Sequence, residues 1–120
     1  MLTILVVEDE FGVADVVVTA LEDEGYRVLV AANGRQGMER IADTKPDLII
    51  LDFMMPIMDG AAMGKAVRAN ADGIAGVPIV MTSAVSEAAV KDRFADFQAF
   101  LRKPFRIQEL LETVEQLIGK

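Results

Sequence analysis

The sequence contains no histidine and no cysteine among its 120 residues. Without histidine, the chain cannot carry a phosphohistidine or build a Ser-His-Asp triad, so any histidine chemistry must come from a partner. Without cysteine, it cannot form disulfides or bind a metal through thiolates, although this absence does not by itself settle the cellular compartment. Two common classes of catalytic and metal site are therefore excluded.

Basic residues are also scarce, with 12 Lys and Arg against 19 Asp and Glu, which gives a formal charge of −7. An acidic chain has no general attraction for nucleic acid or anionic lipid, so we expect no direct nucleic-acid binding. The apolar run at the N-terminus lacks a basic flank and ends in acids, unlike a signal peptide. No uncharged apolar stretch is long enough to span a membrane, so we expect no membrane contact and a cytoplasmic protein.

Short apolar runs alternate with helical patterns along a length that suits one domain, residues 1–120. The expected strands are residues 2–7, 27–31, 47–51, 77–82 and 99–102, and the expected helices are 11–24, 34–43, 60–70, 86–94 and 107–118. Asn33 and Asp59 are the expected N-caps of the second and third helices. Strict alternation predicts an α/β fold in which helices cover both faces of a parallel sheet. Ligands of such sheets bind outside the carboxyl ends of the strands.

Polar residues stand at those expected strand ends. They are Glu8 and Asp9 after the first strand, Asp52 after the third, Thr82 and Ser83 after the fourth, and Lys103 after the fifth. Clustered carboxylates repel one another, and a divalent cation such as Mg²⁺ relieves that repulsion. A nearby ammonium group can hold an anionic ligand. Together these groups predict a phosphoryl-binding site with one carboxylate as the candidate nucleophile.

Each of these residues alone also has a simpler interpretation. Acids after a strand often cap the next helix, and Glu8, Asp9 and Glu10 would serve that purpose. Asp52 followed by Pro and Gly is typical of a turn, and so is Lys103-Pro104. Only the joint pattern, in this order, is specific.

A series of motifs across nearly the whole chain resembles the CheY-like receiver domain of bacterial response regulators. The motifs, in chain order, are Val6-Val7-Glu8-Asp9-Glu10, Gly25-Tyr26, Ala32-Asn33-Gly34, Pro46-Asp47-Leu48-Ile49-Ile50-Leu51-Asp52, Met55-Pro56-Ile57-Met58-Asp59-Gly60, Pro78-Ile79-Val80-Met81-Thr82-Ser83-Ala84 and Lys103-Pro104-Phe105. The resemblance implies a doubly wound (βα)5 fold, flavodoxin-like, with strand order 2-1-3-4-5. It also implies a phosphorelay switch with weak self-catalysed transfer and hydrolysis, rather than a metabolic enzyme.

The resemblance assigns a role to individual residues. Asp52 is implied as the phosphoacceptor, Lys103 as the contact of the phosphoryl oxygens, and the Lys103–Pro104 bond as cis. Mg²⁺ is implied at Glu8, Asp9, Asp52 and the backbone carbonyl of Met54. Ser83 and Phe100 match the switch hydroxyl and the switch aromatic; Thr82 is the rival hydroxyl, which strand alternation turns to the other side.

The resemblance also implies partners. A sensor histidine kinase or histidine phosphotransferase would donate the phosphoryl group, and a downstream effector would read the surface of the fourth helix, the fifth strand and the fifth helix. A weak homodimer is also compatible with the resemblance.

The stretch before Lys103 departs from the family pattern. It reads Ala95-Asp96-Phe97-Gln98-Ala99-Phe100, where relatives carry a Gly-Ala pair. Ser83 and Lys103 are 20 positions apart (103 − 83), fewer than expected, so helix four or its exit is shortened. Of Phe94, Phe97 and Phe100, we expect two in the core and one exposed, and we expect Met54, Met55 and Met58 to fill gaps around the loop after Asp52.

Three other functions compete with this one. The first is a pseudo-receiver that only binds proteins, although such modules commonly lose one of the key residues. The second is a flavodoxin-like cofactor binder, which would need a hydroxyl-rich phosphate loop where Glu8, Asp9 and Glu10 stand. The third is an aspartate-dependent phosphatase, whose usual second Asp is replaced here by Met54.

Overall fold

The structure, a computed structural model, describes residues 1–119. The strands are β1 (Thr3–Val7), β2 (Arg27–Ala31), β3 (Leu48–Asp52), β4 (Ile79–Ser83) and β5 (Ala99–Arg102). The helices are α1 (Phe11–Asp23), α2 (Gly34–Asp43), α3 (Gly60–Arg68), α4 (Glu87–Lys91) and α5 (Ile107–Ile118). Lys120, the last residue of the expected domain, lies outside the described residues.

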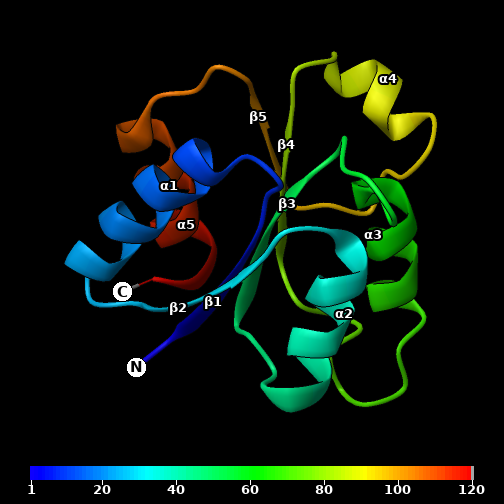
Figure 1. The fold of residues 1–120 in the computed structure, drawn as a ribbon, viewed down its shortest axis with the longest axis horizontal. Helices are drawn as coiled ribbons and strands as arrows, with labels where there is room; N and C mark the ends of the chain where they lie inside the picture. Colours follow the sequence, from blue (N-terminus) through cyan, green and yellow to red (C-terminus); the bar gives the residue numbers. More distant parts are fainter. Residues whose placement is uncertain (120) are drawn as a thin grey trace.

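The strands form one five-stranded parallel sheet in the order β2-β1-β3-β4-β5 (Figure 1). The expected doubly wound fold and its strand order are confirmed. Every residue of β1, β3 and β4 is buried, because helices cover both faces of these inner strands. The carboxyl ends of β1 and β3 lie side by side, since Val7 is the register partner of Leu51.

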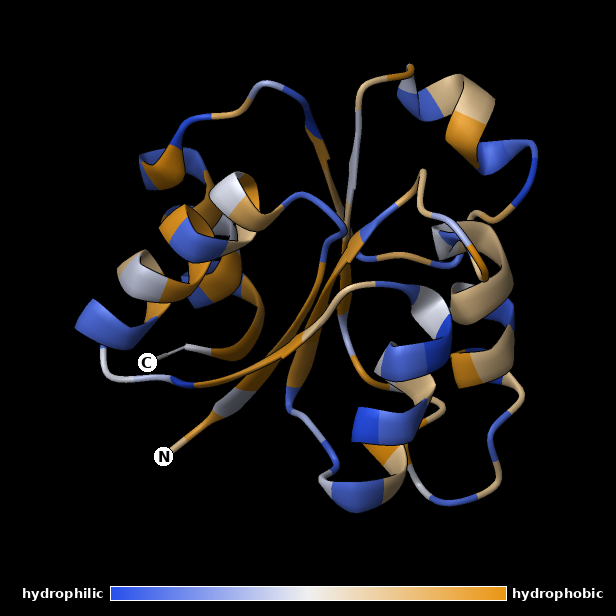
Figure 2. Ribbon diagram, in the orientation of Figure 1, coloured by the Kyte–Doolittle hydropathy of each residue, from blue (hydrophilic) through white to orange (hydrophobic). Residues whose placement is uncertain are grey.

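Two apolar layers hold the helices to the sheet. Helices α1 and α5 cover one face, and α2, α3 and α4 cover the other (Figure 1). Alternate strand residues supply each layer: Leu5, Ile49 and Met81 lie toward the α2–α4 side, and Ile4, Ile50 and Val80 lie toward the α1–α5 side. The hydropathy colouring shows apolar strands between helices with polar outer faces (Figure 2). No helix within residues 1–119 is long and apolar enough to cross a membrane.

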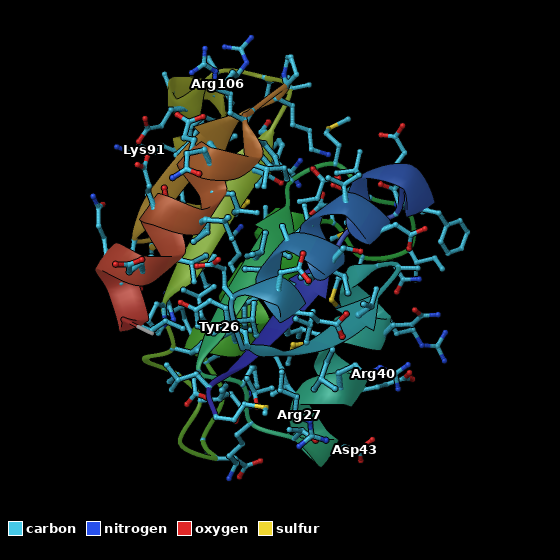
Figure 3. The ribbon with its side chains drawn as sticks, turned by 90° about the vertical axis from the view of Figure 1, so that its left-hand side faces the viewer. Tyr26, Arg27, Arg40, Asp43, Lys91 and Arg106 are labelled. Carbon is cyan, nitrogen blue, oxygen red and sulfur yellow. The ribbon has the colours of Figure 1, made fainter. Side chains whose placement is uncertain are left out.

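Caps and anchors fix the ends of several helices. The side chains of Asn33, Asp59 and Ser86 each accept a hydrogen bond from a backbone N–H in the first turn of α2, α3 and α4, respectively, so both expected caps are confirmed. Tyr26, which lies in the turn before β2 (Figure 3), donates its hydroxyl hydrogen to the Gly119 carbonyl at 2.6 Å. This bond joins the start of β2 to the end of α5.

Helix α4 is the element that differs most from the sequence-based boundaries. It ends at Lys91, three residues before the expected end at Phe94. The expected shortening relative to the family stays a prediction. Phe94 is buried, and its ring lies 2.6 Å from the position that a Cβ atom on Gly64 of α3 would occupy. The chain therefore leaves the helical path where Phe94 turns inward against α3.

Two expectations about side-chain packing were wrong in part. Phe94 alone is fully buried, whereas Phe97 and Phe100 are half-buried, and neither is fully exposed. Met55 and Met58 pack against the core as expected, but the side chain of Met54 is 62% exposed. The sequence pattern could not distinguish Met54 because the loop's path, rather than its composition, decides which methionine turns outward.

Candidate functional site

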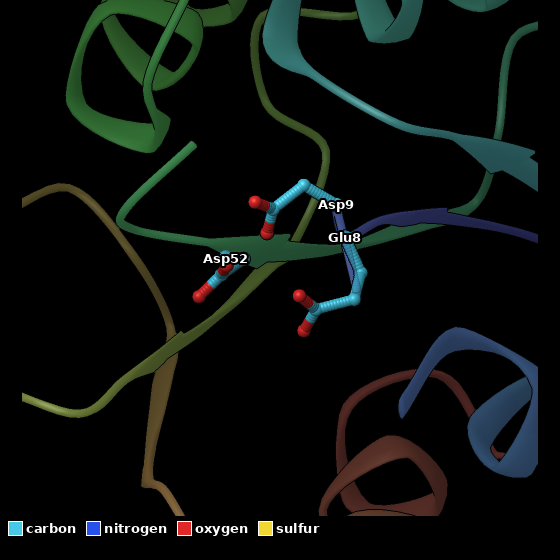
Figure 4. A group of neighbouring side chains, drawn as sticks. All are labelled: Glu8, Asp9 and Asp52. Carbon is cyan, nitrogen blue, oxygen red and sulfur yellow. The ribbon is translucent and has the colours of Figure 1, made fainter. Parts of the chain in front are cut away.

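The site begins with three carboxylates at one edge of the sheet. Asp52 ends β3, and Glu8 and Asp9 directly follow the neighbouring strand β1. One oxygen from each of the three carboxylates lies within 4.8 Å of the others, and the side chains converge on a common space (Figure 4). Glu8 and Asp52 are buried, whereas Asp9 is exposed. The structure therefore brings together the acidic residues that the sequence selected.

Lys103, which directly follows β5, completes the charged group, and β5 is separated from β3 by β4. Its backbone N–H donates to the Ser83 carbonyl at 2.8 Å, which holds it beside the end of β4. Its Nζ lies 2.7 Å from Glu8 Oε1 and 3.2 Å from Asp52 Oδ1, and its side chain is 19% exposed. The Lys103–Pro104 peptide bond is cis, as the resemblance implied.

The surroundings of Asp52 change the pKa of its carboxyl group. Burial, followed by the charge of Glu8, raises the pKa of Asp52 from 3.8 to about 7, and the ammonium of Lys103 opposes this rise. Burial lowers the pKa of Lys103, but the hydrogen bond to Glu8 and the charges of Asp52 and Glu8 outweigh burial and leave that pKa raised. Lys103 is therefore a stable cation, and the carboxylates carry more negative charge than it neutralises.

The capping interpretation of the acids after β1 does not account for their arrangement. Glu10 is the N-cap residue of α1, yet its side chain makes no capping hydrogen bond. Glu8 Oε2 accepts only a long hydrogen bond from the Glu10 backbone N–H, at 3.3 Å, while Glu8 Oε1 faces Lys103. Glu8 and Asp9 are therefore directed toward the site and not toward the start of the helix.

Two buried hydroxyls stand at the end of β4. Thr82 is the register partner of Asp52, and Ser83 alternates to the face of Met81. Ser83 Oγ accepts a hydrogen bond from the Val85 backbone N–H at 2.9 Å. The choice of Ser83 as the switch hydroxyl stays a prediction.

The expected switch aromatic lies on the same face as Ser83. Phe100 is the register partner of Met81 and packs against the core layer to which Met81 belongs. Its ring centroid is 6.0 Å from that of Phe97, whose own centroid is 6.4 Å from that of Phe94. The rings of Phe94, Phe97 and Phe100 connect β5 to the exit of α4. Movement of Phe100 would therefore change the packing at the exit of α4.

One contact near the site was missed by sequence reasoning. The guanidinium of Arg93, beyond α4, lies 3.0 Å from Asp59 Oδ2 and 5.6 Å above the ring of Phe53, which follows Asp52. Asp59 and Arg93 are 34 residues apart, and no motif or spacing relates them. Only the folded chain shows that Arg93, at the exit of α4, contacts Phe53 and Asp59 in the segment that follows Asp52.

The donor set fits a hard divalent cation. Carboxylate oxygens grouped within 4.8 Å are the ligands that Mg²⁺ prefers, and the exposed Asp9 leaves a side open to water and substrate. Lys103 lies opposite and can hold anionic oxygens as a point charge. The arrangement suits the positioning and charge neutralisation that phosphoryl transfer requires.

Comparison with solved structures gives a close match in fold. The chemotaxis protein CheY4 of Vibrio cholerae superposes with a TM-score of 0.89 at 30% identity, covering 98% of this chain and 99% of that one. The receiver domain of a sensor histidine kinase from Pseudomonas aeruginosa superposes with a TM-score of 0.89 at 30% identity, covering 99% and 98%. That structure has a magnesium ion coordinated in its active-site cleft.

Sequence comparison leads to the same family. The response regulator MprA of Mycolicibacterium vanbaalenii is 35% identical over 98% of this chain, which spans about half the length of that relative. The phosphate regulon regulator PhoB of Pseudomonas aeruginosa is 33% identical and is also covered over about half its length, 52%. Residues 4–115 match the family model of the response regulator receiver domain. The chain belongs to the response regulator receiver domain family of two-component systems.

Proposed function

We propose that residues 1–120 act as one receiver domain that takes a phosphoryl group onto Asp52. The observation that carries the proposal is the position of Asp52. It is buried at a strand end, close to Glu8 and Asp9 and 3.2 Å from the ammonium of Lys103. Glu8, Asp9, Asp52 and the backbone carbonyl of Met54 would hold Mg²⁺, which supplies charge neutralisation at the phosphoryl oxygens. A carboxylate surrounded in this way is a nucleophile for phosphorus.

The transfer step needs little more than alignment. A carboxylate oxygen of Asp52 attacks the phosphorus of a partner's phosphohistidine, the phosphorus–nitrogen bond breaks, and the imidazole nitrogen keeps the electron pair. The product is an acyl phosphate on Asp52, and Lys103 contacts its oxygens. Because this chain has no histidine, that phosphohistidine belongs to a partner, which we propose is a sensor histidine kinase or a histidine phosphotransferase. Hydrolysis of the acyl phosphate returns the domain to its resting state.

The pseudo-receiver is the alternative that shares this fold. It would need neither an aligned carboxylate nor a paired lysine, yet Lys103 lies within 3.2 Å of Asp52 and 2.7 Å of Glu8. Three neighbouring carboxylates repel one another, and this repulsion lowers the stability of the fold unless a cation offsets it. Such a grouping is expected where it serves a function. The observed grouping therefore favours the phosphoacceptor.

Phosphate incorporation tests the proposal directly. Wild-type protein incubated with acetyl phosphate and Mg²⁺ should incorporate one phosphate, and the Asp52→Asn variant should incorporate none, because an amide cannot attack phosphorus. Intact-protein mass spectrometry measures the added mass, and Asp59→Asn, at the cap of α3, is the matched control. Equal incorporation in the Asp52→Asn variant would remove Asp52 from the role proposed for it.

Phosphorylation would change the surface made by α4, β5 and α5 through Ser83 and Phe100. The new phosphoryl oxygens would draw the Ser83 hydroxyl inward and break its 2.9 Å hydrogen bond with Val85, which releases the loop after β4. Phe100, on the same sheet face, would then move into the vacated space and shift its contact with Phe97. A downstream effector, or a second copy in a weak homodimer, would read that surface.

Beryllofluoride, a mimic of the phosphoryl group, gives a test of this switch. We expect amide NMR shifts at Val85, Phe97 and Phe100 that exceed those in α2, because the released loop borders β5. Ser83→Ala should abolish the shifts at Phe100, whereas Thr82→Val should keep them. Shifts confined to the Asp52 pocket in the wild type would mean that the domain binds the mimic without switching.

The surroundings in which the domain works are part of the same proposal. A chain of formal charge −7 has no general attraction for nucleic acid, so any DNA-binding output would come from another domain or a partner. We propose that it acts in the cytoplasm, where ATP-dependent kinases and Mg²⁺ are present.

A further inference from the structure

The loop between β3 and α3, residues 53–59, contains a strained residue at Ile57. Its φ is +70°, in the left-handed region that L-residues rarely adopt and β-branched residues least of all. The Met58 backbone N–H donates to the Pro56 carbonyl at 2.7 Å, which closes a γ-turn around Ile57. Within residues 1–119 the other positions with positive φ are all glycines, at Gly25, Gly73 and Gly119. Ile57 is therefore the exception to how this chain makes such turns.

Packing does not explain the isoleucine. The side chain of Ile57 is 75% exposed, and that of Met54 in the same loop is 62% exposed. Filling the core would be a reason to keep a β-branched residue in a strained turn, but here the side chain faces solvent. Strain that persists without a folding benefit is a property of functional sites.

The loop is held rigidly beside the candidate nucleophile. It leaves from the end of β3 and returns there, because the Gly60 backbone N–H donates to the Phe53 carbonyl at 2.9 Å. The return is so close that a Cβ atom on Gly60 would lie 2.4 Å from the Asp52 carbonyl oxygen. The Met58 carbonyl accepts from the Gly34 backbone N–H at 2.9 Å, which fixes the loop to the start of α2. Ile57 is thus presented on a preformed turn and does not swing freely.

We propose that Ile57, with Met54 of the same loop, is an apolar contact for the phosphohistidine-bearing partner; this inference rests on the proposed function. Asp52 is only 4% exposed, so a protein that brings an imidazole to it must also cover the loop that begins and ends at Asp52. A small donor reaches the carboxylate without touching Ile57. The partner surface would place an apolar side chain next to its histidine, and basic side chains toward the exposed Glu10.

Replacing Ile57 should relieve backbone strain, which raises stability, and remove the partner contact, which lowers the transfer rate. These opposite effects make the inference testable. Ile57→Asn should raise the melting temperature by about 4 °C, because a side chain without a branched Cβ atom is less strained at positive φ. The same change should slow phosphoryl transfer from a protein donor about tenfold, as loss of a central apolar contact does. Phosphorylation by acetyl phosphate should stay within twofold of wild type. Ile57→Leu is the matched variant: it keeps the apolar contact and should keep the transfer rate.

The experiment uses the whole chain and two donors. The cytoplasmic kinase domains of the organism's own sensor kinases are autophosphorylated with radiolabelled ATP, and the one that phosphorylates the wild type fastest is kept. Transfer rates to wild type, Ile57→Asn and Ile57→Leu are then measured beside rates with acetyl phosphate. Thermal unfolding gives the stability of each variant.

The outcomes separate this inference from the proposed function. Slower transfer from the kinase alone, with a higher melting temperature and rescue by Leu, supports the contact. Equal kinase rates for Ile57→Asn and wild type would overturn it, and so would an equal loss with both donors, which would mean that the loop shapes the chemistry. Phosphorylation by acetyl phosphate but by none of the kinases would overturn the partner contact and leave the role of Asp52 intact. A wild type that accepts phosphate from neither donor would overturn the proposed function itself.

Discussion

The Asp52→Asn variant is expected to be more stable than the wild type at pH 8 in metal-free buffer. Burial and the charge of Glu8 raise the pKa of Asp52 from 3.8 to about 7, so the folded protein pays for holding this group ionised. A difference of about three in pKa corresponds to roughly 4 kcal/mol. Asn removes that cost but loses the attraction to Lys103, so we expect a net gain of about 2 kcal/mol, or roughly 8 °C in melting temperature.

The sign of the pH dependence follows from where the proton sits. Between about pH 4 and pH 7 the folded state keeps a proton on Asp52 that the unfolded state has released. The free energy of unfolding of the wild type therefore falls as the pH rises through this window, and the loss is complete above about pH 7. The advantage of Asp52→Asn should accordingly grow from pH 4.5 to pH 8. Thermal unfolding followed by circular dichroism at intervals across this range measures it.

Mg²⁺ should reverse the order of the two proteins at pH 8. The cation neutralises the ionised carboxylates of the wild type, and binding to the folded state alone raises stability by mass action. The Asn variant lacks one of the charges and should gain much less. Asp59→Asn is the control, since Asn also caps a helix and its stability should follow the pH and Mg²⁺ dependence of the wild type. Parallel pH curves for wild type and Asp52→Asn would show that Asp52 ionises at its ordinary pKa.

The sequence allowed the fold to be predicted because hydrophobic periodicity and strand ends are local signals. The inner strands are continuous apolar runs, such as Leu48–Leu51, and residues buried on both faces leave few alternatives to a parallel sheet. The site followed from that sheet, since parallel strands bring their carboxyl ends to one edge. Asp52 and Glu8 therefore had to lie close together once β1 and β3 were recognised as neighbours.

The remaining features depend on contacts that no local pattern contains. The guanidinium of Arg68 donates to the carbonyls of Ala75 and Val77 at 2.9 and 2.6 Å, and to that of Asp96, 28 residues away. This arginine anchors the atypical segment before β5, yet in the sequence it is only a basic residue near a helix end. The positive φ of Ile57 was equally hidden, because turn propensities predict glycine or asparagine there.

The sequence also left the resting position of Lys103 undetermined. The resemblance placed it against phosphoryl oxygens, whereas in this structure its ammonium lies closest to Glu8, at 2.7 Å, with Asp52 at 3.2 Å. The carboxylate that Lys103 contacts depends on how far its side chain extends past β4. Glu8 follows β1 and Asp52 ends β3, and neither strand is a sheet neighbour of β5. The pairing implies that Lys103 must release Glu8 in part when a phosphoryl group arrives.

Lys103→Met is expected to slow phosphorylation of Asp52 by acetyl phosphate about 100-fold or more at saturating Mg²⁺, the scale seen when one fixed group that stabilises developing charge is removed. Met keeps most of the length and packing of the lysine side chain but carries no charge. Formal charges explain the size of the effect. Glu8, Asp9 and Asp52 carry three negative charges, and Mg²⁺ with Lys103 supplies three positive ones. Without Lys103 the site keeps an excess negative charge that repels the incoming phosphoryl oxygens.

The same variant should separate chemistry from folding. In metal-free buffer it should be destabilised, because removing one partner leaves two nearly buried carboxylates without their cation, and Mg²⁺ should restore most of the lost stability. A second change, Glu8→Gln in the Lys103→Met background, should recover stability without Mg²⁺, yet it should not recover the rate, because the phosphoryl contact is still absent.

Lys91→Met, at an exposed ion pair on α4, is the control and should change neither quantity. Acetyl phosphate kinetics and thermal unfolding of these variants decide the matter. A Lys103→Met rate within threefold of wild type would mean that Lys103 only balances Glu8, and that the charge on the phosphoryl group is met by the metal alone.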